Sequence, residues 1–122
     1  MDTETFEGIV GRVIDALPEH IASRVEDIAV VVEDEPSPDD RRDYSTDGVL
    51  LGRYSGVPLT RRRVRGRSSI ARMPDLIKLY QGPIERACHG DETCVARLVE
   101  TTLLRQIGRY FGLPDASGIG TP

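Results

Sequence analysis

Hydrophobic residues near the start of the chain recur at helical spacing. Apolar side chains stand at i, i+3, i+4, i+7, i+8 and i+11, namely Phe6, Ile9, Val10, Val13, Ile14 and Leu17. Such spacing is typical of a helix that buries one stripe of its surface. Asp2 or Thr3 can cap its first turn, and Pro18 closes it. The pattern predicts a helix over residues 4–17.

A second pattern, short apolar runs between turn residues, predicts strands. Residues 28–32 form a continuous β-branched and apolar run, which predicts a strand buried on both faces. Residues 49–54 and 76–80 are two further strand candidates, bounded by glycines and prolines. Between the first two runs, the polar stretch 33–47 contains two prolines and predicts a loop.

The last helix is predicted over residues 91–111, after a shorter one. Its core face recurs mainly at four-residue spacing and comprises Val95, Leu98, Val99, Thr102, Leu103, Ile107 and Phe111. At about 100° per residue, the long side chains of Arg105, Gln106 and Arg109 fall on or beside that face. The stems of such side chains can lie along apolar surface while their heads reach water. The order of elements predicts an α+β fold with two main helices packed on a small mixed sheet.

Length and composition agree with one domain over residues 1–122. No apolar run approaches the length of about 20 residues that a membrane span needs, and the acidic start does not resemble an export signal. The sequence therefore predicts a cytoplasmic protein without a membrane partner. Two cysteines, Cys88 and Cys94, are too few for a disulfide framework. Because the cytoplasm is reducing, we expect both to be free thiols.

The net charge of −4 conceals an asymmetry along the chain. Residues 1–43 hold 13 acidic and 4 basic side chains, whereas residues 44–122 hold 7 acidic and 12 basic ones. Five arginines crowd positions 61–67, which raises nucleic-acid binding as one hypothesis. Because no aromatic residue interleaves with them, we favour a solvated, mobile basic loop over residues 60–72. Residues 116–122 are predicted to be a flexible tail.

The segment from Leu104 to Asp115 has the residue spacing of a catalytic zinc helix, but it lacks the metal ligands and the general base of such a helix. Such a helix needs His at i and i+4 and a general base, Glu, at i+1. Those slots hold Arg105, Arg109 and Gln106. Arginine has no lone pair for a metal, and the amide of glutamine does not take a proton from water.

Beyond this helix, the chain resembles the small bacterial zincin-like metallopeptidase family. Five blocks carry the resemblance in family order, namely residues 6–10, 29–36, 50–59, 77–84 and the motif helix. The family motif reads His-Glu-x-x-His-x-x-Gly-x-x-Asp, and here only Gly112 and Asp115 match it. The resemblance implies a minimal zincin fold and, in the family, a zinc ion with the Asp as third ligand. Because both His positions hold arginine, we expect no zinc in this chain.

The same match makes the motif positions the candidate binding site, with a vestigial third-ligand position. Its residues are Arg105, Gln106, Arg109, Tyr110 and Asp115. The guanidinium groups are expected to replace the charge of the metal, with Arg109 favoured over Arg105 as the partner of Asp115. The alternative is that the two arginines hold an anion or a carboxylate of a partner. Cys88, His89 and Cys94 supply only three soft ligands, so a structural zinc site is not expected there either.

Two classes of function follow. The first is a non-catalytic protein that binds a peptide or protein partner by strand addition, as zincin folds align substrates beside the motif helix. The strand involved would belong to residues 50–59 or 77–81. The second is a metallopeptidase or other hydrolase with a rearranged site, although neither Glu100 nor Asp115 forms part of a known pairing of nucleophile and base. Nucleic-acid binding by the arginine loop is a further alternative.

Overall fold

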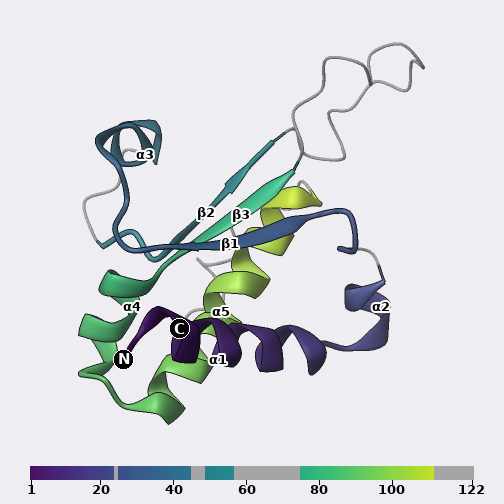
Figure 1. The fold of residues 1–122 in the computed structure, drawn as a ribbon. Coiled ribbons are helices and arrows are strands. Elements are labelled where there is room, and N and C mark those ends of the chain that lie inside the picture. The colour runs from purple at the N-terminus through teal and green to yellow at the C-terminus, as the bar shows by residue number, and fades with distance from the viewer. Residues whose placement is uncertain (24, 45–48, 57–74, 112–122) are drawn as a thin grey trace.

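The computed structural model describes residues 1–23, 25–44, 49–56 and 75–111. Its elements follow in the order α1 Thr3–Asp15, α2 Glu19–Ala22, β1 Ala29–Glu33, α3 Pro38–Tyr44, β2 Gly52–Ser55, β3 Leu76–Tyr80, α4 Gln81–Cys88 and α5 Glu92–Tyr110. In Figure 1 the three strands lie above α1 and α5, and α3 stands on the other side of the sheet. The predicted α+β fold is confirmed. Within the described ranges, no helix is long and apolar enough to cross a membrane.

The first helix begins where the sequence pattern placed it. The carboxylate of Asp2 accepts a hydrogen bond from the Thr5 N–H at 2.8 Å, which satisfies one of the unpaired donors of the first turn. Phe6, Ile9 and Val10 are buried. The helix stops at Asp15, two residues earlier than predicted, and Leu17 is buried after the helix has ended.

The sheet has the strand order β1-β3-β2, with β1 parallel and β2 antiparallel to β3. As the central strand, β3 lies over residues 76–80 as predicted, and Ile77, Leu79 and Tyr80 are almost completely buried. The expectation that residues 28–32 are buried on both faces is wrong. Ala29 is exposed and the rest of β1 is half-buried, because this strand forms one edge of the sheet. At the other edge, β2 covers only the last part of the predicted 49–54 strand and extends to Ser55.

The prediction of a loop over residues 33–47 is wrong in its middle, where α3 forms. Ser37 caps this helix, since its hydroxyl accepts from the Asp40 N–H at 3.0 Å and its own N–H donates to the Asp40 carboxylate at 3.1 Å. Pro38 occupies the first helical position, where its missing N–H costs no hydrogen bond. This reciprocal capping box was visible in the sequence as Ser37-x-x-Asp40. The predicted mobile loop over 60–72 and the predicted tail over 116–122 lie outside the described residues.

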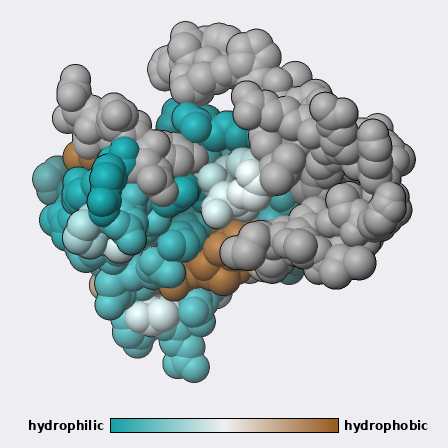
Figure 2. Space-filling view, turned by 90° about the horizontal axis from the view of Figure 1, so that it is seen from above, coloured by the Kyte–Doolittle hydropathy of each residue, from teal (hydrophilic) through white to brown (hydrophobic). Residues whose placement is uncertain are grey.

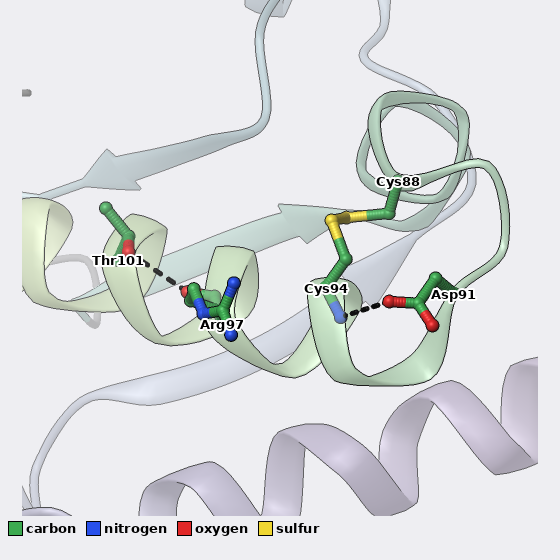
Figure 3. The surroundings of a disulfide bond; sticks show 5 residues. All are labelled: Cys88, Asp91, Cys94, Arg97 and Thr101. Carbon is green, nitrogen blue, oxygen red and sulfur yellow. Dashed lines mark hydrogen bonds between the residues drawn. A yellow bond between two sulfur atoms is a disulfide. The ribbon is translucent and has the colours of Figure 1, made fainter.

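The prediction that Cys88 and Cys94 are free thiols is also wrong, because the structure joins them in a disulfide (Figure 3). Helix α4 ends at Cys88, and the turn that follows takes a left-handed conformation at His89, with φ of 52°. The Asp91 carboxylate then caps α5 by accepting from the Cys94 N–H at 3.0 Å. This tight connection leaves the two Cα atoms 5.5 Å apart, which lies within the range that a disulfide spans.

Candidate functional site

The motif residues lie in the last two turns of α5, the longest helix of the described chain. Most of the predicted core stripe of this helix is confirmed, with Val95, Val99, Leu103 and Ile107 all buried against α1, the sheet and α4. Leu98 and Phe111 are only half-buried, and Phe111 follows the end of the helix, which is one residue shorter at each end than predicted. The stripe explains why the helix is rigidly placed, since one continuous apolar face fixes its rotation against the sheet.

Of the motif residues themselves, Gln106 is the most deeply buried. Only 3% of its surface is exposed, and its side-chain oxygen has no hydrogen-bond partner within the described residues. Arg105 and Arg109 flank it and are half-buried. An amide placed among apolar neighbours without a partner loses hydration free energy.

Tyr110 is the fourth candidate residue that the structure describes, and 6% of its surface is exposed. Its ring meets the Tyr54 ring edge to face at 6.0 Å and the Phe111 ring at 5.2 Å. These contacts make Tyr110 part of the packing between α5 and β2. Asp115 lies outside the described residues, so its predicted pairing with Arg109 stays a prediction.

Strand β2 lies directly against the motif face of α5, at a position that only glycine fits. A Cβ atom built at Gly52 would lie 2.6 Å from the Thr102 methyl carbon and 3.0 Å from the Lys78 carbonyl oxygen. Thr102 is one turn before Gln106, so both project from the same face of the helix. The structure therefore brings Thr102 and the ring of Tyr110 against an edge strand of the sheet, and Gln106 projects from the same face of α5 as Thr102.

A buried hydrogen bond joins Tyr54 on β2 to Asp75, the residue before β3. The sequence pattern did not predict it. The Tyr54 hydroxyl donates to the Asp75 carboxylate at 2.8 Å, and both residues are less than a tenth exposed. The two residues stand 21 positions apart in the chain and neither belongs to a motif. Only the pairing of β2 with β3 brings them together.

A second polar cluster, also missed from the sequence, lies on the outer face of the sheet. The Asp40 carboxylate is buried, and it accepts a hydrogen bond from the Arg53 guanidinium at 2.7 Å. The ammonium of Lys78 lies 3.4 Å from the same carboxylate and 3.7 Å from that of Glu33. Because Arg53 and Lys78 stand opposite each other on β2 and β3, the cluster ties α3 to both strands. Figure 2, which views this face, shows a mainly hydrophilic surface broken by an apolar patch.

The cluster shifts the pKa values of two buried groups. Burial alone would raise the pKa of the Asp40 carboxyl, because an apolar environment disfavours charge. Its contacts with the Tyr80 side chain, the Ser37 N–H and the two cations outweigh burial and hold that pKa well below its usual range. Burial, and then the negative charge of Asp40, raise the pKa of the Tyr80 hydroxyl. Asp40 is therefore charged and Tyr80 protonated at neutral pH.

The motif residues do not fit a zinc ion. Arg105 and Arg109 offer no lone pair where a zinc helix has its two histidines, and Gln106 cannot serve as the base. Among the residues that the structure describes, no group of three or more His, Cys, Asp or Glu side chains is placed to hold a metal ion. Cys88 and Cys94 are bonded to each other, so their sulfur atoms are not thiolate ligands.

Comparison with known proteins points to one family. The model of the zincin-like metallopeptidase family matches residues 25–117. Among solved structures, a conserved hypothetical protein from Thermo thermophilus superposes with a TM-score of 0.55 at 23% identity, covering 91% of this chain and 94% of that one. At this identity the likeness concerns the fold. A search of curated proteins gives no match.

Proposed function

Since the chain belongs to the zincin-like metallopeptidase family while two cations and an amide occupy the motif positions, we propose that it binds a peptide or protein partner without hydrolysing it. The observation that supports this proposal is the close packing of α5 on the edge strand β2, at Thr102 and Gly52, one helical turn before the motif position Gln106. The family match supports a fold that could still align a peptide, while the motif positions lack the groups that activate water.

Strand β2 is the element that best fits the role of the peptide-aligning strand. Sequence reasoning left residues 50–59 and 77–81 as alternatives for it. Strand β3 is paired on both sides, by β1 and β2, so it has no edge to offer. Strand β2 is an edge of the described sheet and is the strand that contacts the motif face of α5 at Gly52. An extended partner could add to it through main-chain hydrogen bonds.

The chemistry of the site favours an acidic partner. Arg105 and Arg109 bring two permanent positive charges to the position where the family resemblance implies a divalent cation. A guanidinium group binds a carboxylate in a planar, two-point geometry, which adds selectivity to attraction. We therefore expect the partner segment to be extended and to carry Asp, Glu or a terminal carboxylate near its centre.

The test joins a binding assay to a cleavage assay on protein purified without chelator. An array of extended peptides that vary one central residue should select acidic members, and anisotropy titration should then give their dissociation constants. Arg105→Ala should weaken the best of them by about tenfold, a typical cost for losing one charge-assisted contact. Arg97→Ala removes an exposed arginine on the same helix and is the matched control. Mass spectrometry of the peptides should show no cleavage with or without chelator.

Two outcomes would count against the proposal. Chelator-sensitive cleavage by highly pure protein would restore the hydrolase alternative. Equal loss of binding in the Arg105 and Arg97 variants would show that the attraction is general and not located at the motif face.

A further inference from the structure

The opposite edge of the sheet, formed by β1, carries features of a second interaction surface. Its sequence, Ala29-Val30-Val31-Val32-Glu33, is a β-branched strand without the proline or lysine that commonly protects a sheet edge. Within the described residues β1 pairs with β3 alone. An edge of this composition is a template for another strand.

The phase of the β1–β3 ladder shows which backbone groups face outward. The Ala29 N–H donates to the Asp75 carbonyl at 3.1 Å. Because the ladder is parallel, the N–H and C=O groups of Ala29, Val31 and Glu33 therefore point toward β3. The N–H and C=O groups of Val30 and Val32 consequently point away from the sheet. They could form four main-chain hydrogen bonds with an added strand.

A groove runs beside this edge, between β1 and α1. One hollow of about 430 Å³ is lined by residues of α1 and β1, namely Glu7, Val10, Gly11, Ile14, Val30, Val31 and Val32. A second hollow, of about 350 Å³ and mainly apolar, continues from it along Ile14 and Val30 to Ile28 and Val25. Alternate side chains of a strand added to β1 would point toward α1 and could fill this groove.

The charges around the groove decide which partner suits it. Among its described lining residues the charged ones are Glu7 and Glu26, one in each hollow, and both are exposed. Glu33 ends the strand on the outer face, where its carboxylate lies 3.7 Å from the ammonium of Lys78. A second copy of the chain would bring these carboxylates close to an identical set, which costs free energy by like-charge repulsion. A basic segment would meet complementary charge instead.

We propose that the β1 edge and its groove dock an extended segment of another protein that has apolar residues at its centre and Lys or Arg at both ends. Alternate apolar residues enter the groove beside Ile14, and the cations at the two ends lie near Glu7 and Glu26, one in each hollow. This surface differs from the β2 edge in both its position and its charge preference, so it does not depend on the function proposed above.

The probe for this proposal is a capped peptide, Lys-Lys-Val-Thr-Val-Lys-Lys, compared with a counterpart in which Glu replaces each Lys. Titration followed by amide hydrogen exchange in NMR spectra should show that the basic peptide slows exchange at Val30 and Val32. The amides of Ala29 and Val31 already face β3, so their exchange should change much less. The acidic counterpart should bind at least tenfold more weakly. The Arg105→Ala variant should bind the basic peptide as the native chain does.

A charge reversal separates the groove from general attraction. The double variant Glu7→Lys with Glu26→Lys should weaken binding of the basic peptide by at least tenfold. Glu92→Lys with Glu100→Lys, on exposed positions of α5, makes the same change in net charge and should alter binding less than twofold. Thermal melting of both variants checks that each remains folded.

Several results would overturn the proposal. Protection that appears at Gly52–Ser55 and not at Val30 and Val32 would place the peptide on the other edge. Equal binding of the acidic peptide, or equal loss in both double variants, would remove the charge argument. Protection of Val30 and Val32 without peptide, together with a dimer in sedimentation, would make a second copy the occupant. Absence of binding at millimolar peptide would also contradict it.

Discussion

The two edges of the sheet differ in almost every property that matters for recognition. Strand β2 is antiparallel to its neighbour and packs through Gly52 on Thr102 of α5, the helix that carries Arg105 and Arg109. Strand β1 is parallel, borders an apolar groove and lies among carboxylates such as Glu7 and Glu26. The comparison teaches that the two edges of one small sheet have different surroundings and need not bind the same partner.

Anchoring differs between the edges as well. On its outer face β2 is held by a buried ion network through Arg53 and Asp40, whereas β1 is held mainly by apolar contacts of Val30 and Val32 with the core. Ionic anchoring responds to pH and to the loss of one partner, while apolar anchoring responds to changes of volume. The two edges should therefore fail under different treatments.

The largest effect is expected from restoring the missing chemistry beside β2. The triple substitution Arg105→His, Gln106→Glu and Arg109→His supplies two imidazole nitrogens and a carboxylate on the motif face, with Asp115 as the third ligand that the family resemblance implies. Zinc affinity should rise by several orders of magnitude, measured as metal content after purification without chelator. Arg105→Leu with Arg109→Leu is the control for loss of charge alone. Stoichiometric zinc in the native chain would contradict this reading of the site.

A large loss of stability is expected when the ionic anchor of β2 is removed. Asp40→Ala takes away the buried carboxylate that Arg53 and Lys78 face, and breaking a buried ion pair costs roughly 3–5 kcal/mol. Urea denaturation should show this as a lower free energy of unfolding. Asp39→Ala, at the exposed neighbouring position, should stay within about 0.5 kcal/mol of the native chain. Equal effects of the two substitutions would show that the network contributes little.

Acid should weaken the same anchor. The pKa of Asp40 is lower in the folded chain than the value of about 3.9 expected when unfolded, so its stabilisation is present above that value and is lost as the pH falls below it. Denaturation curves measured from pH 6 downward should show decreasing stability, and Asp40→Asn should flatten that dependence. A parallel decline in the native chain and the variant would assign acid sensitivity to other carboxyl groups.

A smaller effect is expected from adding one methyl group at each edge. Gly52→Ala forces its Cβ against Thr102 and should cost about 1–3 kcal/mol, and Thr102→Ser in the same chain should recover part of it by removing the crowded methyl. Gly11→Ala, in α1 beside β1, meets no atom within 4 Å and should stabilise its helix by about 0.5–1 kcal/mol. Thermal melts compare the two, and a harmless Gly52→Ala would refute the close packing of β2 on α5.

Local periodicity determined much of this fold. The stripe from Phe6 to Leu17 and the four-residue spacing in α5 predicted both long helices, because a helix repeats every 3.6 residues whatever lies around it. The run at residues 76–80 predicted β3 with its observed bounds. The family resemblance also came from the sequence, and so did the absence of zinc-binding chemistry at Arg105, Gln106 and Arg109, because those conclusions depend only on residue types in a known frame.

Only the tertiary structure decided what depends on distant parts of the chain. An apolar run such as residues 28–32 has the same sequence pattern whether it forms a central strand or an edge strand. Within the described residues this strand pairs with β3 alone, which makes it an edge. The same pairing joined Tyr54 to Asp75 and carried Arg53 and Lys78 to Asp40. The bond between Cys88 and Cys94 likewise required the tight connection of α4 to α5. Long-range contacts of this kind follow from strand order and helix packing, which leave no periodic signal in the residues that make them.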